Sequence, residues 1–105
     1  MDIDELCWHD GNITRFELLS NYGGEAQINI YAEIYDDPVG SPRRDAVLLK
    51  CIGVSRFNCA CDLAELNDNS SAGSIADCHF KNNIVRFYLS GGYIEIESSK
   101  YVFEK

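Results

Sequence analysis

The chain has 105 residues, a length typical of one globular domain, which we expect to span residues 1–105. Hydrophobic residues make up 46% of it and charged residues 25%, as in soluble proteins, and no apolar run approaches the roughly 20 residues that cross a membrane. The formal net charge of −8 at pH 7 argues against binding to nucleic acid or anionic membranes and favours a basic partner.

The N-terminal stretch MDIDE (residues 1–5) is acidic, whereas a secretion signal begins with basic and then apolar residues. The chain contains five cysteines, and an odd number does not make a complete disulfide framework. We therefore expect a cytoplasmic protein whose cysteines are free thiols.

The first strand is predicted over residues 13–20 (ITRFELLS), with Phe16 and Leu18 on its inner face. Residues 21–25 (NYGGE) follow, and paired glycines supply the positive φ angles that a tight hairpin needs. Residues 25–35 (EAQINIYAEIY) then alternate apolar and polar side chains with period two. This pattern predicts a second strand with one face on the core and one wetter face.

Residues 36–45 (DDPVGSPRRD) predict a loop, because they hold two prolines, a glycine and several charges. Residues 46–57 (AVLLKCIGVSRF) predict a third strand that is apolar on both faces, with a bulge at Gly53. Residues 58–69 (NCACDLAELNDN) change character, since an Asp that suits an N-cap precedes Leu-Ala-Glu-Leu. One short helix is therefore expected near 61–67.

The rest of the chain predicts four short strands, at residues 74–80, 84–90, 93–98 and 100–104. The turns KNN (81–83) and GG (91–92) separate strands, because Asn and Gly tolerate left-handed backbone. The predicted fold class is mainly β. We expect about seven mostly antiparallel strands in a curved sheet, a sandwich or a partly open barrel, with the one short helix.

His9 and Asp10 stand side by side before the first strand, and such a pair suits metal binding or proton transfer because imidazole titrates near neutrality. The chain has only two histidines and no Gly-x-Ser-x-Gly nucleophile motif. We therefore interpret Trp8 as a packing anchor and residues 10–12 as the turn that opens the sheet. We predict no catalytic residue and no cofactor.

Four residues form a candidate zinc set: Cys59, Cys61, Cys78 and His79. Zinc sites usually space their cysteines by two to four residues, and a gap of one is tight for two ligands on one metal. Cys78 and His79 are adjacent, so in a strand they would face opposite ways. We therefore predict no metal site, and the spacing of Cys59 and Cys61 also departs from the redox motif with two intervening residues.

The layout of the chain carries a resemblance. The stretch WHDGNITRFEL (8–18) leads through a Gly-rich hairpin into a long alternating strand, followed by LLKCIGVSRF (48–57), a short insert and the paired strands that end in GGYIEIESSKYVFE (91–104). This layout resembles the small β-rich immunity and immunity-like families of bacterial polymorphic toxin systems, several of which open on a His-Asp turn. The resemblance implies a cytoplasmic, non-catalytic inhibitor that binds a toxin domain.

The distribution of charge is compatible with such an inhibitor. Residues 1–37 contain nine acidic residues and one basic residue, whereas residues 38–105 are balanced. Acidic groups steer a basic partner, and tyrosine is often an interface hot spot. The predicted partner-binding residues are Asp2, Asp4, Glu5, Tyr31, Glu33, Tyr35, Asp36 and Asp37.

Two other functions stay open at this point. One is a small-molecule-binding β-domain with a pocket lined by Tyr31, Tyr35, Phe87 and Trp8. The other is an enzyme that uses His9. Tyrosines on the wetter face of a strand are also common cross-strand partners in a sheet, which is a purely structural role.

Overall fold

The computed structural model describes residues 8, 10–20, 24–35, 44–61 and 74–104, and all structural statements below concern these residues. They form six β-strands and no helix. The strands are β1 (Asn12–Leu19), β2 (Gln27–Tyr35), β3 (Arg44–Cys61), β4 (Ile75–Lys81), β5 (Ile84–Leu89) and β6 (Gly92–Glu104).

The six strands make one open antiparallel sheet in the order β1-β2-β3-β6-β5-β4. Neighbours in the sheet are neighbours in sequence except at the centre, where β6 lies between β3 and β5. The central pair is long, because β3 and β6 pair from Leu48 opposite Glu104 to Cys61 opposite Gly92.

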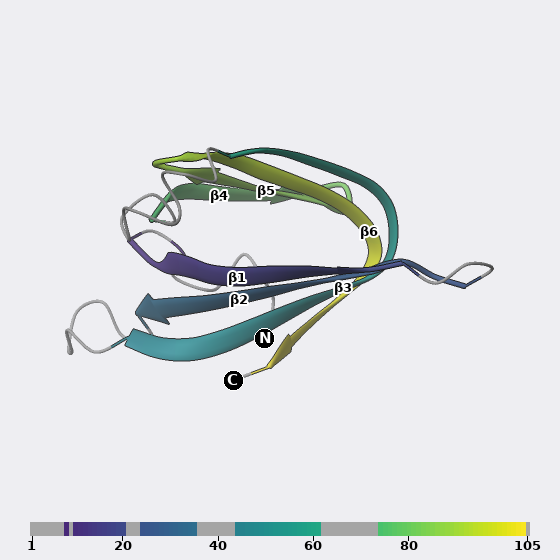
Figure 1. Cartoon of the computed structure of the whole chain (residues 1–105), viewed down its shortest axis with the longest axis horizontal. Coiled ribbons are helices and arrows are strands. Elements are labelled where there is room, and N and C mark those ends of the chain that lie inside the picture. The colour runs from purple at the N-terminus through teal and green to yellow at the C-terminus, as the bar shows by residue number, and fades with distance from the viewer. Residues whose placement is uncertain (1–7, 9, 21–23, 36–43, 62–73, 105) are drawn as a thin grey trace.

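The sheet bends back on itself, so that two layers face each other (Figure 1). Both layers contain part of β3 and part of β6, because β2 pairs with β3 only as far as Ile52 and β5 pairs with β6 only from Gly92 to Glu97. At the bend Gly53 has a φ of +69°, and the register with β6 shifts just beyond it. The bulge predicted at Gly53 therefore lies slightly further along the strand, between Val54 and Arg56.

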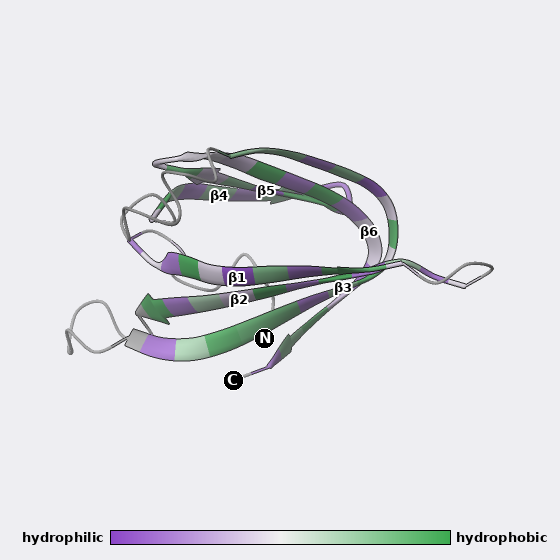
Figure 2. Ribbon diagram, viewed as in Figure 1, coloured by the Kyte–Doolittle hydropathy of each residue, from purple (hydrophilic) through white to green (hydrophobic). Residues whose placement is uncertain are grey.

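The core fills the space between the layers, and hydrophobic and hydrophilic residues alternate along the strands (Figure 2). The alternation predicted for residues 25–35 is confirmed, because Ile28, Ile30, Ala32 and Ile34 are buried. The other buried hydrophobic side chains are Trp8, Val47, Leu49, Cys51, Ile75, Val85, Phe87, Leu89, Ile94 and Ile96.

Trp8 packs as the predicted anchor, since its ring meets that of Phe87 edge-on at a centroid distance of 5.1 Å. The backbone N–H of Gly11 donates to the Trp8 carbonyl at 2.9 Å, which closes the turn expected before the first strand. A side chain at Gly11 would press on Ile34 Cγ2, on the Glu33 carbonyl and on the Trp8 carbonyl, all within 3.0 Å of its Cβ. The corner therefore requires glycine for lack of space.

The two outer strands of the sheet meet at this corner. Asn12 and Ser74 form an isolated antiparallel bridge, and the N–H of Ile75 donates to the Gly11 carbonyl at 2.8 Å. The N–H of Asp10 donates to the Ile75 carbonyl at 2.9 Å. These contacts join β1 and β4 at one end only, so the rest of the β1 edge has no neighbouring strand among the described residues.

Two predictions about the elements are wrong. The segments 93–98 and 100–104 are one strand, β6, so the described chain has six strands where about seven were expected. Ser98 and Ser99 mark the bend inside β6, and their hydroxyls donate to the Ile52 carbonyl at 2.6 and 3.1 Å. The two serines resemble a turn in the sequence, but in the structure their hydrogen bonds stabilise a bend within one strand.

The third strand is also longer than predicted, because β3 begins at Arg44 and continues to Cys61. Residue 61, where the predicted short helix would begin, is therefore the end of a strand. Residues 62–67 of that helix lie outside the described residues.

Candidate functional site

The first candidate site is the outer face of β1 and β2. Gln27, Asn29, Tyr31 and Glu33 alternate with the buried residues of β2 and point away from the core. The register places two β1 residues beside them, with Arg15 opposite Tyr31 and Glu17 opposite Asn29. We call these six residues the β1–β2 face: Arg15, Glu17, Gln27, Asn29, Tyr31 and Glu33.

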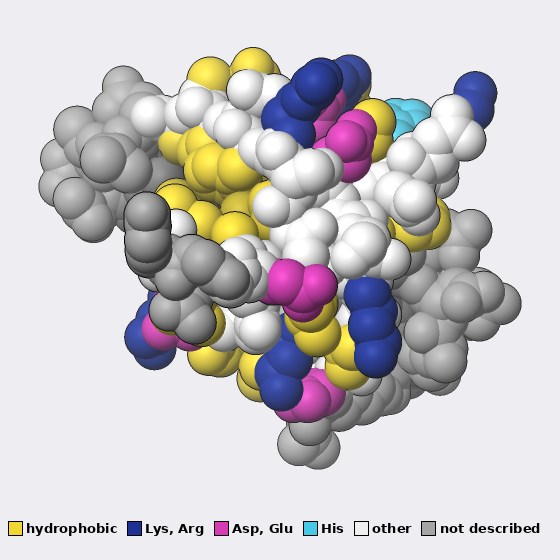
Figure 3. All heavy atoms as spheres, turned by 90° about the vertical axis from the view of Figure 1, so that its right-hand side faces the viewer, with side chains coloured by type: hydrophobic (Ala, Val, Ile, Leu, Met, Phe, Trp, Pro, Cys, Tyr) yellow, Lys and Arg dark blue, Asp and Glu magenta, His cyan; other side chains and the backbone are white. Residues whose placement is uncertain are grey.

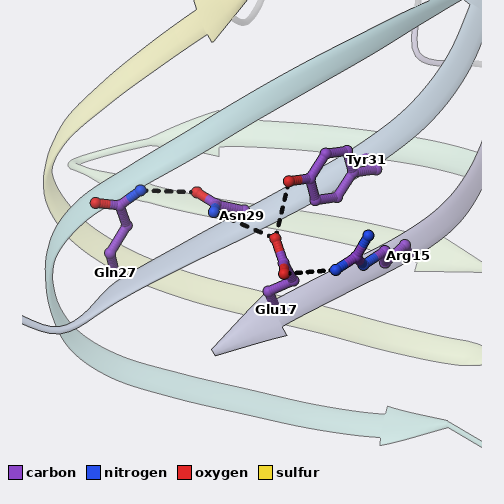
Figure 4. Close-up of polar contacts among 5 residues, drawn as sticks. All are labelled: Arg15, Glu17, Gln27, Asn29 and Tyr31. Atoms are coloured by element: carbon purple, nitrogen blue, oxygen red, sulfur yellow. Dashed lines mark hydrogen bonds and ion pairs between the residues drawn. The ribbon is translucent and has the colours of Figure 1, made fainter. Parts of the chain in front are cut away.

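Glu17 is the centre of this face (Figure 4). The Tyr31 hydroxyl donates to Glu17 Oε1 at 2.8 Å, and Asn29 Nδ2 donates to the same oxygen at 3.5 Å. Arg15 Nη2 lies 2.7 Å from Glu17 Oε2. Gln27 Nε2 in turn donates to Asn29 Oδ1 at 2.8 Å, so one connected network crosses both strands.

The hydrogen bonds of this network shift two pKa values. The hydrogen bond from Tyr31 is the main reason that the pKa of Glu17 is lowered, and those from Asn29 and Arg15 act in the same direction. The hydrogen bond to Glu17 raises the pKa of Tyr31. Near neutral pH the carboxylate is therefore charged, and Tyr31 is held as a neutral donor with the guanidinium of Arg15 5.2 Å from its ring centroid.

Two of the eight predicted partner-binding residues have described side chains, and both lie on the β1–β2 face. Tyr31 is half-buried in the network, and Glu33 is exposed two residues further along β2. Tyr35 ends β2, and its side chain is outside the described part. The other five predicted residues, Asp2, Asp4, Glu5, Asp36 and Asp37, also lie outside it.

The described residues include nine acidic and seven basic ones, a net charge of −2. The whole chain has a net charge of −8, so most of the excess negative charge belongs to residues outside the described ranges. The sheet itself is thus nearly balanced, and its faces differ by how their charges are paired.

A second polar face lies on the outside of β4, β5 and β6. We call it the β4–β6 face: Asp77, His79, Arg86, Tyr88, Tyr93 and Glu95. The register places Tyr88 opposite Tyr93 and Arg86 opposite Glu95, with which it forms an ion pair. Arg86 Nη1 also donates to the Tyr88 hydroxyl at 3.1 Å.

On the β4 side of this face, His79 Nε2 lies 2.9 Å from Asp77 Oδ2, and the His79 ring meets Tyr88 edge-on. An open depression runs beside these residues and is also lined by Lys81 and Arg86. It offers cationic and aromatic groups together at the surface. Sequence reasoning missed this face, although alternate residues of 74–80, 84–90 and 93–98 carry its side chains.

The candidate zinc ligands are not brought together. Cys59 Sγ and Cys61 Sγ lie 3.4 Å apart on β3, whereas Cys78 and His79 belong to β4, on the far side of β6 and β5. Cys78 is half-buried and His79 is exposed, as expected of strand neighbours that face opposite ways. In the described ranges no three His, Cys, Asp or Glu side chains form a metal-binding cluster.

Three of the thiols, those of Cys51, Cys59 and Cys78, are held in the protonated form. Burial raises the pKa of Cys51 and Cys78 to about 12 each, and that of Cys59 to about 11. A thiol is nucleophilic as the thiolate, so these three cysteines are poor nucleophiles at neutral pH.

The pocket suggested for a small ligand is wrong. Trp8 and Phe87 are in the core between the layers, while Tyr31 lies half-buried on the opposite, outer face of β2. Alternation correctly predicted which face of β2 each residue occupies. It did not show that Trp8 and Phe87 lie on the side of the sheet opposite to Tyr31. The sequence also suggested His9 and Asp10 as a candidate catalytic or metal-binding pair. His9 is outside the described residues, and Asp10 lies in the turn at the corner.

No family model matches the sequence, and neither the comparison with curated proteins nor that with solved structures returns a match. No helix of the length and hydrophobicity needed to cross a membrane occurs in the described part of the chain.

Proposed function

We propose that this chain is a non-catalytic, cytoplasmic binding protein, an immunity-like inhibitor that binds a basic toxin domain through the β1–β2 face. One observation carries the proposal: a network centred on Glu17 fixes Tyr31 beside the exposed carboxylate of Glu33. The net charge of −8 supports it, because an acidic protein attracts a basic partner over long range.

The geometry of Tyr31 suits an interface. A tyrosine that is already held in one orientation loses little conformational entropy on binding, and tyrosine is enriched among interface hot spots. Its neighbour Glu33 has no ion-pair partner among the described residues, so its charge is available to a lysine or arginine. The face thus combines an ordered aromatic group with an unpaired negative charge.

The test is a pull-down with the immobilised full chain from its own cell's lysate, loaded at low salt and eluted with rising salt. One stoichiometric basic partner is expected. Association rates are then compared for Glu33→Lys and Tyr31→Ala, with Asp77→Lys and Tyr93→Ala on the β4–β6 face as matched controls. The charge change should slow association and Tyr31→Ala should speed dissociation, while the controls leave both rates unchanged.

Two results would count against this assignment. A partner that responds to the controls and not to Tyr31 and Glu33 would move the interface to the β4–β6 face. Reversing the charges of Asp36 and Asp37 together tests the remaining part of the predicted site, and an unchanged association rate at low salt would exclude those two residues from it.

A second function is favoured by the depression beside Tyr88. Arg86, Lys81 and an aromatic ring line it together, a combination that suits a small anionic aromatic ligand. In this case a lysate yields no partner protein, and a metabolite screen by nuclear magnetic resonance should shift resonances of Tyr88 and Arg86. Shifts confined to the β1–β2 face, or none, would reject this alternative.

A further inference from the structure

The two outer strands of the sheet differ in how well their hydrophobic side chains are covered. On β4 the inner-facing residues are packed, since Phe80 meets Tyr101 edge-on at a centroid distance of 5.1 Å and Cys78 is half-buried. On β1, Phe16 is 36% exposed and Leu18 is 56% exposed. With respect to the described residues, the β1 edge therefore presents hydrophobic surface together with backbone groups that pair with no strand, a combination that invites another strand.

Phe16 and Leu18 are exposed although they do not point to the outer face of the sheet. They lie opposite the buried residues Ile30 and Ile28, so they point toward the inner side of the sheet as the sequence predicted. They remain exposed because β1 is the last strand and no described strand lies beside it. Hydrophobic side chains also gather in a hollow of the surface in the view of Figure 3.

We propose that a second copy of this chain occupies the β1 edge, so that two β1 strands pair antiparallel about a two-fold axis at Phe16. The inference does not rest on the proposed function, but it uses two side chains of the β1–β2 face, Arg15 and Glu17, and leaves Tyr31 and Glu33 to a partner. A two-fold dimer needs a surface that is complementary to itself, and β1 meets this condition through the order of its charges.

The charges favour the register centred on Phe16 over the two registers centred on its neighbours. Centring the axis on Arg15 or on Glu17 would place like charges opposite each other, which is destabilising. Centring it on Phe16 places Arg15 of each copy opposite Glu17 of the other, and both residues are on the outer face. A shift by one residue would place outer side chains opposite inner ones, so it is excluded by the alternation.

The same register covers the hydrophobic side of the edge. It brings the two Phe16 side chains together on the inner face, and each already lies 6.2 Å from its own Phe57, measured between ring centroids. Four aromatic rings would then meet at the axis, an arrangement that removes exposed apolar surface from water. In this register Leu18 lies opposite residue 14 of the other copy, so the bulge between Ile13 and Arg15 limits regular pairing to residues 15–17 of each strand.

The test is sedimentation equilibrium of the full chain over a wide concentration range, with reductant present because Cys59 is exposed. The wild type is expected to dimerise. Arg15→Glu and Glu17→Arg each place like charges opposite twice in the interface, so each should weaken the dimer about tenfold or more. Mixing the two variants restores opposite charges and should give a tight heterodimer.

Glu33→Arg is the matched control, because it makes the same change of charge on β2, away from the edge, and should leave the dimer unchanged. If Glu17→Arg unfolds the chain, Leu18→Lys replaces it, since that side chain is largely exposed. A wild type that stays monomeric at every concentration overturns the proposal. A dimer that is insensitive to Arg15→Glu and to Leu18→Lys overturns it equally.

Discussion

The β1–β2 face and the β4–β6 face each combine an arginine, a glutamate and a tyrosine on neighbouring antiparallel strands, yet the hydrogen bonds of their tyrosines run in opposite directions. On the first face Tyr31 donates its proton to the carboxylate of Glu17. On the second face Tyr88 accepts a proton from the guanidinium of Arg86. Tyr31 can therefore only accept a further hydrogen bond, whereas Tyr88 keeps its O–H to donate.

This difference shows that the charge at the centre of a face decides what its tyrosine offers a partner. These three residue types alone would not distinguish the faces, since both have an arginine, a glutamate and a tyrosine on paired strands. The faces also share one core, because their strands are opposite layers of the same bent sheet (Figure 1). Substitutions at Phe87, at Gly53, at the two arginines and at Glu17 separate what the faces share from what distinguishes them.

The largest effect is expected from the shared core. Phe87 is fully buried against Trp8, so Phe87→Ala should lower the free energy of unfolding by about 3–5 kcal/mol. Urea unfolding followed by Trp8 fluorescence measures the loss. Tyr88→Ala, next to it on the exposed side, is the control. A loss no greater than the control's would contradict a core that supports both layers.

The bend that separates the two faces comes next. Gly53 has a φ of +69°, and a Cβ there would collide with the Ser99 hydroxyl, so Gly53→Ala should cost about 1–2 kcal/mol from the backbone alone. The double variant Gly53→Ala with Ser99→Ala removes the collision and keeps the backbone cost. Thermal unfolding of both variants distinguishes the two contributions, and a neutral Gly53→Ala would show that the bend tolerates any residue.

The two arginines should differ by a smaller amount. The ion pair of Arg86 with Glu95 is more buried than that of Arg15 with Glu17, with side-chain exposures of 44% and 15% against 63% and 27%. Arg86→Ala should therefore cost about 1 kcal/mol and Arg15→Ala close to zero. Denaturant unfolding at low and high salt compares them. Equal losses of stability in the two variants would mean that the greater burial of the Arg86–Glu95 pair does not make it more stabilising.

The smallest effect is a dependence on pH. Because the folded pKa of Glu17 lies below its ordinary value of 4.5, its charge stabilises the fold above that pH, and this stabilisation is lost as the pH falls through the folded pKa. Glu17→Gln should accordingly have a lower melting temperature than the wild type at pH 7. The two melting temperatures should converge at acid pH. If the two melting temperatures differed by the same amount from pH 7 to acid pH, the loss of stability would not come from the charge of Glu17.

The sequence was most informative where one face of a strand is buried. Period-two alternation predicted both faces of residues 25–35, because burial of one side fixes the orientation of every residue. It also placed Phe16 and Leu18 on the inner side, but it did not predict their exposure. Alternation tells which side a residue points to, while its exposure depends on what lies beyond the edge of the sheet.

The Glu17 network needed information that the sequence does not contain. Arg15 and Glu17 share a face by alternation, but only the register of the β1–β2 pair decides that Glu17 meets Asn29 and Tyr31. The extra length of β3 was missed for a different reason. A short helical pattern next to Cys61 suggested an end of the strand, whereas pairing with β6 continues it to that residue.

The position of β6 has a consequence for how the chain folds. The last of the described strands lies at the centre of the sheet, and its pairs with β3 join residues as distant as Leu48 and Glu104. Until β6 is synthesised, β1–β3 and β4–β5 are two groups of strands that share only the corner contacts between β1 and β4. We therefore expect the native sheet to form only after the ribosome has released β6, and at the slow rate typical of proteins rich in distant contacts.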